Sequence, residues 1–229
     1  MPSTDLTTVF FDLDDTLVDQ ATAARNAVLV WAGEHGMRAD AALADRWGAV
    51  SERHYRRYQL RELSFAEQRR ERVREFLPGH RDTPDEVADR LFDGYLARYE
   101  AGWTVFGDAV PALRRAREVG LLVGVLTNGE ESHQQLKLRM LALEPEVDVL
   151  VSSSTLSAGK PDPRAFLEAC ARVGAEPGAT LMVGNSLDHD VTGARAAGLR
   201  AVLLDRADAH ADTGVPRVRS LAELDFVAH

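Results

Sequence analysis

Three polar side chains follow directly on a short apolar run near the start of the chain. Asp12, Asp14 and Thr16 come after Val9-Phe10-Phe11. Two residues apart on an extended backbone, the two carboxylates point to the same side. Like charges held this close repel each other unless a cation lies between them or their pKa values are driven apart. Both outcomes serve catalysis, either with a carboxylate nucleophile or with a carboxyl acid and base.

Two further segments add groups that could bind a phosphate. Thr127 and Asn128 follow the apolar run Leu121–Leu126 and offer a hydroxyl and an amide. Lys160 stands before a proline, and it is one of only two lysines among the 27 basic residues, the other being Lys137. A lysine provides a compact point charge, which suits a crowded site of carboxylate and phosphate groups better than a planar guanidinium does.

The fourth motif begins with another apolar run, Leu181–Gly184, which meets a further group of polar residues. Asn185 and Asp190 offer oxygen atoms of the kind that Mg²⁺ prefers, and Asp188 could compensate for the charge that Asn185 lacks. We expect His189 to face solvent, since magnesium prefers oxygen to nitrogen.

The four motifs, taken in order, resemble those of the haloacid dehalogenase (HAD) superfamily, whose first motif is Asp-x-Asp-x-Thr after a hydrophobic strand. The resemblance implies a phosphatase in which Asp12 is the nucleophile that becomes a phosphoaspartate. It implies that Asp14 is the general acid and base. Thr127 and Asn128 would then hold the phosphoryl oxygens, while Lys160 and Mg²⁺ neutralise charge. The substrate would be a small phosphorylated metabolite, such as a sugar, nucleoside or acid phosphate.

The metal site implied by the resemblance comprises Asp12, the backbone carbonyl of Asp14, and Asp190 or Asn185. Asn185 departs from the family pattern Gly-Asp-x-x-x-x-Asp, because it offers an oxygen without the charge of an aspartate. HAD dehalogenases carry an asparagine near this position and use no metal, but they lack the second aspartate of the first motif. A phosphatase is therefore favoured, with a dehalogenase, a phosphomutase and a noncatalytic binding protein as alternatives.

The elements that must position these residues follow from the spacing of apolar residues. Helices are predicted near 20–35, 40–60, 64–77 and 84–100, with a capping box at Ser64 and Glu67. After them, strands at 121–127, 147–152, 180–184 and 201–204 alternate with helices at 107–119, 130–142, 163–173 and 190–197. This alternation predicts an α/β fold with a doubly wound, Rossmann-like parallel sheet.

The helical block between the first two strands reads as an insertion. We expect a core domain from residues 1–17 and 103–229, and a helical cap domain from 18–102. The insertion resembles the C1 cap of HAD enzymes. The stretch Ser132–Leu138 also resembles members that act on nucleoside or sugar phosphates, such as nucleotidases and N-acylneuraminate-9-phosphatases.

Composition narrows the function classes further. Hydrophobic residues make up 45% of the 229 residues and charged residues 28%, which is typical of a globular protein. A net charge of −9 argues against nonspecific nucleic-acid binding, and no apolar run is long enough to span a membrane. We expect a cytoplasmic protein whose oligomeric state stays open. The single cysteine, Cys170, excludes an internal disulfide and is expected in the core.

A basic cluster lies within the inserted block. It consists of Arg53, His54, Arg56, Arg57 and Arg61. Such a cluster could steer an anionic substrate toward the protein. The interpretation that we favour is a solvated helix face, because runs of charge usually lie outside.

Overall fold

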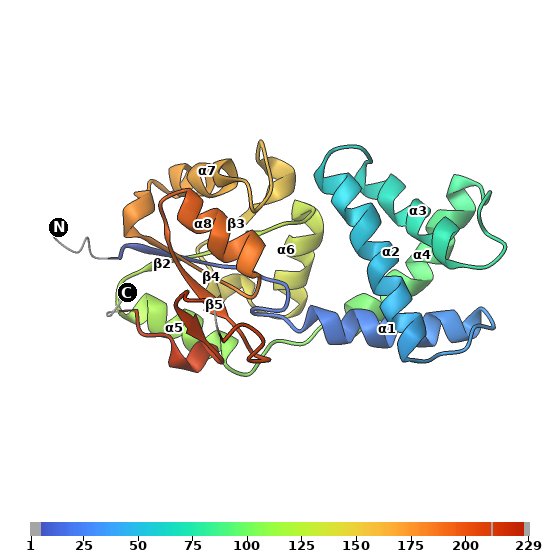
Figure 1. The fold of residues 1–229 in the computed structure, drawn as a ribbon, viewed down its shortest axis with the longest axis horizontal. Helices are drawn as coiled ribbons and strands as arrows, with labels where there is room; N and C mark the ends of the chain where they lie inside the picture. Colours follow the sequence, from blue (N-terminus) through green and yellow to red (C-terminus); the bar gives the residue numbers. More distant parts are fainter. Residues whose placement is uncertain (1–5, 212, 227–229) are drawn as a thin grey trace. The chain divides into compact units, whose positions relative to one another are not determined.

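The computed structural model of the chain describes residues 6–211 and 213–226. They form two compact units. One comprises the described residues within Met1–Asp19 and Val105–His229, and the other is Gln20–Thr104. The first unit is an α/β domain and the second is helical (Figure 1).

The α/β unit contains one six-stranded sheet, and every strand pair in it is parallel. The strands are β1 (Thr8–Phe11), β2 (Leu122–Thr127), β3 (Val149–Ser152), β4 (Thr180–Gly184), β5 (Arg200–Leu204) and β6 (Arg217–Val218). Their order in the sheet is β3-β2-β1-β4-β5-β6. The chain winds outward from β1 in one direction and then in the other, which confirms the predicted doubly wound fold. The reversal occurs beside β1, where such folds bind their ligands.

Helices cover both faces of the sheet, with α5 on one side and α7 and α8 on the other (Figure 1). The core helices are α5 (Ala109–Glu118), α6 (Glu131–Met140), α7 (Pro163–Val173) and α8 (Gly193–Ala196). The helix predicted at 190–197 is divided, because a π-helical segment, η4 (Leu187–Thr192), precedes a short α8. The prediction also missed β6, whose two residues are too few to show an alternating pattern.

The apolar runs of the strands supply the core of this unit. Phe10 and Met182, both fully buried, belong to one cluster with Phe166 and Cys170 of α7. The prediction that Cys170 fills the core is confirmed. A strand covered by helices on both faces must be apolar at consecutive positions, which explains the unbroken hydrophobic runs in the sequence.

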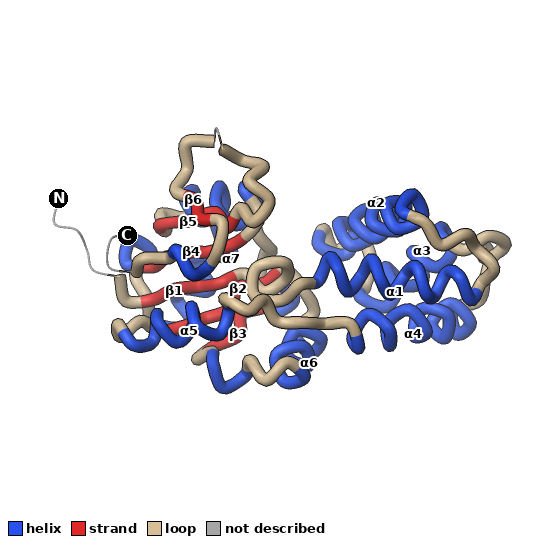
Figure 2. Tube along the Cα trace, turned by 90° about the horizontal axis from the view of Figure 1, so that it is seen from below, coloured by secondary structure: helices blue, strands red, loops and turns tan. Residues whose placement is uncertain are grey.

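The helical unit consists of α1 (Gln20–Glu34), α2 (Ala41–Gln59), α3 (Phe65–Phe76) and α4 (Asp85–Ala101). Figure 2 shows these four helices as one bundle. The predicted capping box is present at the start of α3. The backbone N–H of Glu67 donates to Ser64 Oγ at 3.2 Å, and the backbone N–H of Ser64 donates to Glu67 Oε2 at 2.7 Å. Two N–H groups that the helix leaves unpaired are thereby satisfied.

Aromatic side chains form the centre of the helical unit. Trp31 of α1 stacks on Phe76 of α3, with ring centroids 5.9 Å apart. Trp47 of α2 meets Tyr95 of α4 edge to face, with ring centroids 4.7 Å apart. The rings of Trp31 and Trp47 lie 5.3 Å apart and join the two pairs, so one aromatic cluster connects all four helices.

The two segments that leave the α/β unit toward the insertion are joined by backbone contacts. Val18 forms an isolated antiparallel bridge with Val105, and the N–H of Phe106 donates to the carbonyl of Leu17 at 3.0 Å. The insertion therefore begins and ends at neighbouring points of the core. None of the helices in the described ranges combines the length and the apolar character needed to cross a membrane.

Candidate active site

The carboxyl ends of β2, β1 and β4 bring polar residues to one edge of the sheet. Phe11, the last residue of β1, is in register with residues near the ends of both neighbouring strands. Asp12 follows β1, Thr127 is the last residue of β2, and Asn185 follows β4. Three motifs that lie far apart in the sequence thus meet at the sheet's switch point.

Lys160 connects two buried carboxylates. Its Nζ donates to Asp12 Oδ1 at 2.7 Å, to Asp190 Oδ1 at 2.6 Å and to the carbonyl oxygen of Leu126 at 2.9 Å. All three protons of the ammonium group have an acceptor. Lys160 and Asp190 are 5% and 1% exposed, so this is a desolvated arrangement of one cation between two acids.

The electrostatics leave Asp12 short of positive charge. Burial raises the pKa of Asp12 to about 7; Lys160 opposes the shift, while the negative charge of Asp190 adds to it. Burial opposes the charged form of Lys160 as well, but Asp12 and Asp190 outweigh it and raise the lysine pKa. Because one lysine serves two carboxylates, a further cation would favour the ionised form of Asp12 that a nucleophile requires.

Asp14 has its own buried lysine. The ammonium group of Lys137 donates to Asp14 Oδ1, and the side-chain amide of Gln134 donates to Asp14 Oδ2 at 3.0 Å. Burial by itself would raise the pKa of Asp14, but the charge of Lys137 and the hydrogen bonds from both residues lower it. The pKa values of the two carboxylates of the first motif are therefore shifted in opposite directions, that of Asp12 upward and that of Asp14 downward.

Thr127 is almost fully buried at the end of β2. Its Oγ1 accepts a hydrogen bond from Gln134 Nε2 at 2.8 Å. A hydroxyl that accepts in this way still has its own proton to donate. The hydroxyl can therefore donate to a phosphoryl oxygen.

Asn128 uses both ends of its side chain on the backbone of Lys160. Its Nδ2 donates to the Lys160 carbonyl at 2.7 Å, and its Oδ1 accepts from the Lys160 N–H at 2.8 Å. The peptide bond between Lys160 and Pro161 is cis. In this structure the amide of Asn128 fixes the lysine loop. That Asn128 also holds the phosphoryl oxygens stays a prediction.

Thr16 links the first motif to the fourth. Its Oγ1 lies 3.4 Å from Asp12 Oδ2 and 3.3 Å from Asn185 Oδ1, so that both oxygens share its one proton, and it accepts from the Asn185 N–H at 3.1 Å. The turn that returns Thr16 to the site passes through Asp15 at a φ of 60°, a left-handed conformation that aspartate tolerates better than most residues. Thr16 therefore places one carboxylate oxygen and one amide oxygen close together.

This oxygen pair is the feature of the site that fits a Mg²⁺ ion. Mg²⁺ takes oxygen ligands and is normally held by one or two carboxylates. Asp190 is less suited as a direct ligand, because its Oδ1 accepts from Lys160 and its Oδ2 accepts from the Ser186 N–H at 2.9 Å. Within the described ranges, no group of three or more histidine, cysteine, aspartate or glutamate residues could hold a metal ion. The amide of Asn185 and a backbone carbonyl would have to complete the shell.

The structure also shows the exposure of the other two residues predicted in the fourth motif. His189 is exposed, as predicted, and Asp188 beside it is exposed as well.

The sequence reasoning assigned no role to Gln134 or Lys137, although both contact Asp14. The scarcity of lysine was the signal that could have found Lys137, since the only two lysines of the chain both lie in this site.

The basic cluster of the helical unit is only partly a solvated face. Arg53, Arg56 and Arg61 are exposed, in agreement with the favoured interpretation. His54, however, is buried, and its Nε2 lies 2.8 Å from Glu75 Oε2. The prediction of a uniformly solvated face was wrong at His54, because this position of α2 faces α3 and not the solvent.

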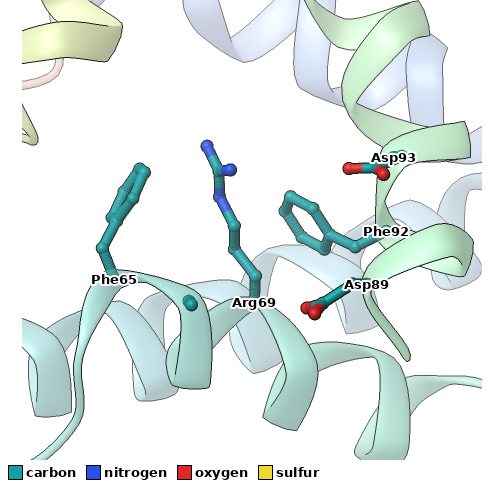
Figure 3. A pocket seen from close by; sticks show the side chains of 6 residues that line it. Phe65, Arg69, Asp89, Phe92 and Asp93 are labelled. Atoms are coloured by element: carbon teal, nitrogen blue, oxygen red, sulfur yellow. The ribbon is translucent and has the colours of Figure 1, made fainter. Parts of the chain in front are cut away.

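A different arginine lines a pocket in the helical unit. Figure 3 shows Arg69 between the rings of Phe65 and Phe92, in a pocket of about 220 Å³. The guanidinium carbon lies 4.1 Å from the centroid of Phe65 and 5.2 Å from that of Phe92. Burial, followed by the like charge of Arg72, lowers the pKa of Arg69. A cation held by aromatic faces lines this pocket.

Comparisons with known proteins agree on one family. A family model described as haloacid dehalogenase-like hydrolase matches residues 6–198. The phosphoserine phosphatase of Thermus thermophilus is 37% identical over 141 residues, which are 60% of this chain and 55% of that protein. The chain thus spans about half the length of that relative. The N-acylneuraminate-9-phosphatase of Rattus norvegicus is 28% identical over 202 residues, covering 85% of this chain and 80% of that protein.

The fold also has close counterparts among solved structures. A putative HAD-hydrolase from Bacillus subtilis, determined with bound magnesium, superposes with a TM-score of 0.81. The superposition covers 96% of this chain and 97% of that one at 21% identity. At this level of identity the similarity shows that the two proteins share a fold.

Proposed function

The chain belongs to the haloacid dehalogenase-like hydrolase family, and from that premise we propose that it is a Mg²⁺-dependent phosphatase of small phosphorylated metabolites. One observation carries the proposal. Asp12 and Asp14, two residues apart at the sheet edge, each bind a buried lysine, and the lysine of Asp12 also binds Asp190. Because two lysines face three carboxylates, a further cation is needed to offset a dianionic phosphate, and this is the charge that Mg²⁺ would supply. The two relatives described above are both named as phosphatases, which supports hydrolysis of a phosphate ester as the reaction.

In the first half of the proposed reaction, a carboxylate oxygen of Asp12 forms a bond to phosphorus. The ester bond between phosphorus and the leaving oxygen breaks, and Asp14 gives that oxygen its proton. Lys137 lowers the pKa of Asp14 in this structure. The negative charge of a phosphate bound at Thr127 would raise it again, because a nearby like charge disfavours ionisation.

In the second half, Asp14 takes a proton from water while the water oxygen forms a bond to phosphorus. The bond between phosphorus and Asp12 breaks, which releases inorganic phosphate and restores both carboxyl groups. Lys160 stays paired with Asp12 and Asp190, so its charge balances the acyl phosphate oxygen as that bond changes. Thr127 donates its hydroxyl proton to a phosphoryl oxygen in both steps.

The residues suited to hold Mg²⁺ are Asp12, the backbone carbonyl of Asp14, and Asn185. Asp190, also predicted as a ligand, would act mainly through Lys160, since both of its oxygens accept hydrogen bonds. When bound, the metal supplies positive charge that offsets the charge of the phosphoryl group and of Asp12.

The test is release of inorganic phosphate from a panel of sugar, nucleoside and acid phosphates, with Mg²⁺ and with a chelator. The matched control is the Asp12→Asn variant at the same concentration. Catalytic phosphate release that requires Mg²⁺ and Asp12 would support the proposal. Product formed without net phosphate release would indicate a phosphomutase. The absence of turnover on every substrate would indicate a noncatalytic binding protein.

A second candidate follows from Asn185, the position at which the chain departs from the phosphatase pattern. A 2-haloacid dehalogenase needs no metal charge there, and it needs no acid at Asp14. The paired arrangement of Asp14 with Lys137 and Gln134 argues for the phosphatase. Halide release from 2-haloacids, measured beside phosphate release, separates the two activities.

A further inference from the structure

Helix α6 presents two buried polar side chains to the same carboxylate. Gln134 and Lys137 are three positions apart, so they share one helix face. They are 3% and 1% exposed, and each binds a different oxygen of Asp14. Burying an ammonium group is costly unless it is paired, so the contact with Asp14 accounts for a lysine at this position.

Gln134 also connects Asp14 to the phosphate-binding hydroxyl. Its Nε2 donates both to Asp14 Oδ2 at 3.0 Å and to Thr127 Oγ1 at 2.8 Å. Its Oε1 is buried and has no hydrogen-bond partner among the described residues. An unsatisfied buried carbonyl destabilises the fold, so its presence points to a requirement for the two N–H donors.

The backbone of Gly129 lies directly against the side chain of Gln134. A Cβ atom on Gly129 would lie only 2.8 Å from Gln134 Nε2 and 3.0 Å from its Cγ. Gly129 thus permits the close approach that brings the amide to Thr127 and Asp14 together.

We propose that Lys137 and Gln134 are positioning residues that fix the Asp14 carboxylate relative to the phosphoryl site at Thr127. This inference rests on the proposed phosphatase activity. With each carboxylate oxygen bound by a different side chain, the plane of the carboxyl group is set by α6 and not by the turn that carries it. Neither residue touches the reacting atoms: Lys137 acts through Asp14, and Gln134 acts through Asp14 and Thr127.

The experiment measures kcat and KM of Lys137→Met on an alkyl phosphate and on p-nitrophenyl phosphate, alone and combined with Asp14→Asn. A misplaced proton donor should lower kcat on the alkyl phosphate by about 10–100-fold, since an error of about 1 Å can cost ~100-fold. The loss on p-nitrophenyl phosphate, whose leaving group needs no proton, should be much smaller. KM should change little on either substrate. In the Asp14→Asn background, the lysine substitution should have almost no further effect.

Arg139→Met is the matched control, because it removes a basic side chain from an exposed position of the same helix. It should match the wild type on both substrates. Gly129→Ala provides a second variant that displaces Gln134 without changing charge, and it should show the same dependence on the leaving group. If Lys137→Met does not unfold cooperatively, the kinetics of Gly129→Ala test the inference in its place.

Equal losses on the two substrates, or losses that multiply with that of Asp14→Asn, would overturn the inference and indicate a structural role. A wild-type protein that releases no phosphate from any substrate would reject the proposed function itself. The two failures are therefore distinguished in one set of assays.

Discussion

Asn128 and Lys160 are joined by a pair of hydrogen bonds in which the asparagine amide acts as donor and acceptor to the lysine backbone. The Lys160 side chain then reaches Asp12 from that fixed point. One residue of the second motif thereby determines the position of the third.

Asn128→Ala should therefore lower kcat more than it raises KM. Loss of both hydrogen bonds frees the loop that carries Lys160, and a misplaced cation weakens charge stabilisation in the transition state; we expect about a tenfold decrease in kcat. Steady-state kinetics on one phosphate ester measures both constants. A large increase in KM with an unchanged kcat would show that Asn128 contacts the substrate directly.

Asp12→Asn should abolish turnover while the fold persists. The amide cannot attack phosphorus, and Lys160 retains Asp190 as its partner. Phosphate release should fall by at least about 1000-fold, as for other nucleophile deletions, with the circular dichroism spectrum unchanged. Asp15→Asn, in the same turn, is the control, because asparagine tolerates its φ of 60°. Activity of Asp12→Asn close to that of the wild type would exclude the covalent mechanism.

Asp14→Asn should reduce turnover of an alkyl phosphate more than that of p-nitrophenyl phosphate. General acid catalysis contributes about 10²–10⁴-fold when the leaving group needs a proton. The measurement is kcat/KM on both substrates under identical conditions. Equal losses would remove Asp14 from the acid role and leave it as a base for the hydrolytic step.

Asn185→Asp should tighten Mg²⁺ binding, since it places a charged oxygen beside Asp12 Oδ2, where Thr16 now joins the two side chains. The added charge also repels the substrate phosphate, so metal affinity and kcat need not rise together. Activity titrated against Mg²⁺ gives the half-saturating concentration. An equal or higher value in the variant would place Asn185 outside the metal shell.

Asp108 provides a test of stability away from the chemistry. Its carboxylate binds both terminal nitrogens of Arg206 at 2.9 Å and accepts from Ser220 Oγ at 2.7 Å and the Leu221 N–H at 2.9 Å. Burial opposes the charge, but these hydrogen bonds lower the pKa of Asp108 to about 2 from an ordinary value of 3.8. The stabilisation is therefore complete above the ordinary pKa and is lost as the pH falls through the folded-state pKa.

Asp108→Asn should lower the free energy of unfolding by about 2 kcal/mol at pH 7, because each pKa unit corresponds to ~1.4 kcal/mol. The difference from the wild type should shrink as the pH falls from about 4 to about 2. Urea denaturation across this range measures both effects. Glu118→Gln, an exposed acid at the end of α5, should show neither. A difference that stays constant with pH would attribute the loss to packing.

The sequence was sufficient to predict the family and the sheet. Strands β1, β2 and β4 are buried on both faces, so each appears as an apolar run ending in polar residues. The parallel topology then requires Asp12, Thr127 and Asn185 to meet at one edge. The match of the family model over residues 6–198 confirms the resemblance that the motifs indicated.

The contacts of α6 could not be predicted in the same way. The helical period places Gln134 and Lys137 on one face, but nothing in the pattern tells which face turns toward the sheet edge. The burial of His54 was missed for the same reason, since its partner Glu75 belongs to another helix. The contact of Asn128 with the Lys160 backbone could not be predicted either, because it depends on a loop conformation that no periodicity encodes.

The bridge between Val18 and Val105 makes the stability of the core depend little on the length of the segment inserted between them. Because the two ends of the helical unit are already paired, the unit has the same effect on the sheet as one long loop closed by that bridge. The entropy of closing such a loop grows only logarithmically with its length, by about 0.6 kcal/mol for each doubling. Evolution can therefore lengthen, shorten or exchange the insertion at little thermodynamic cost to the edge of the sheet that carries Asp12 and Lys160.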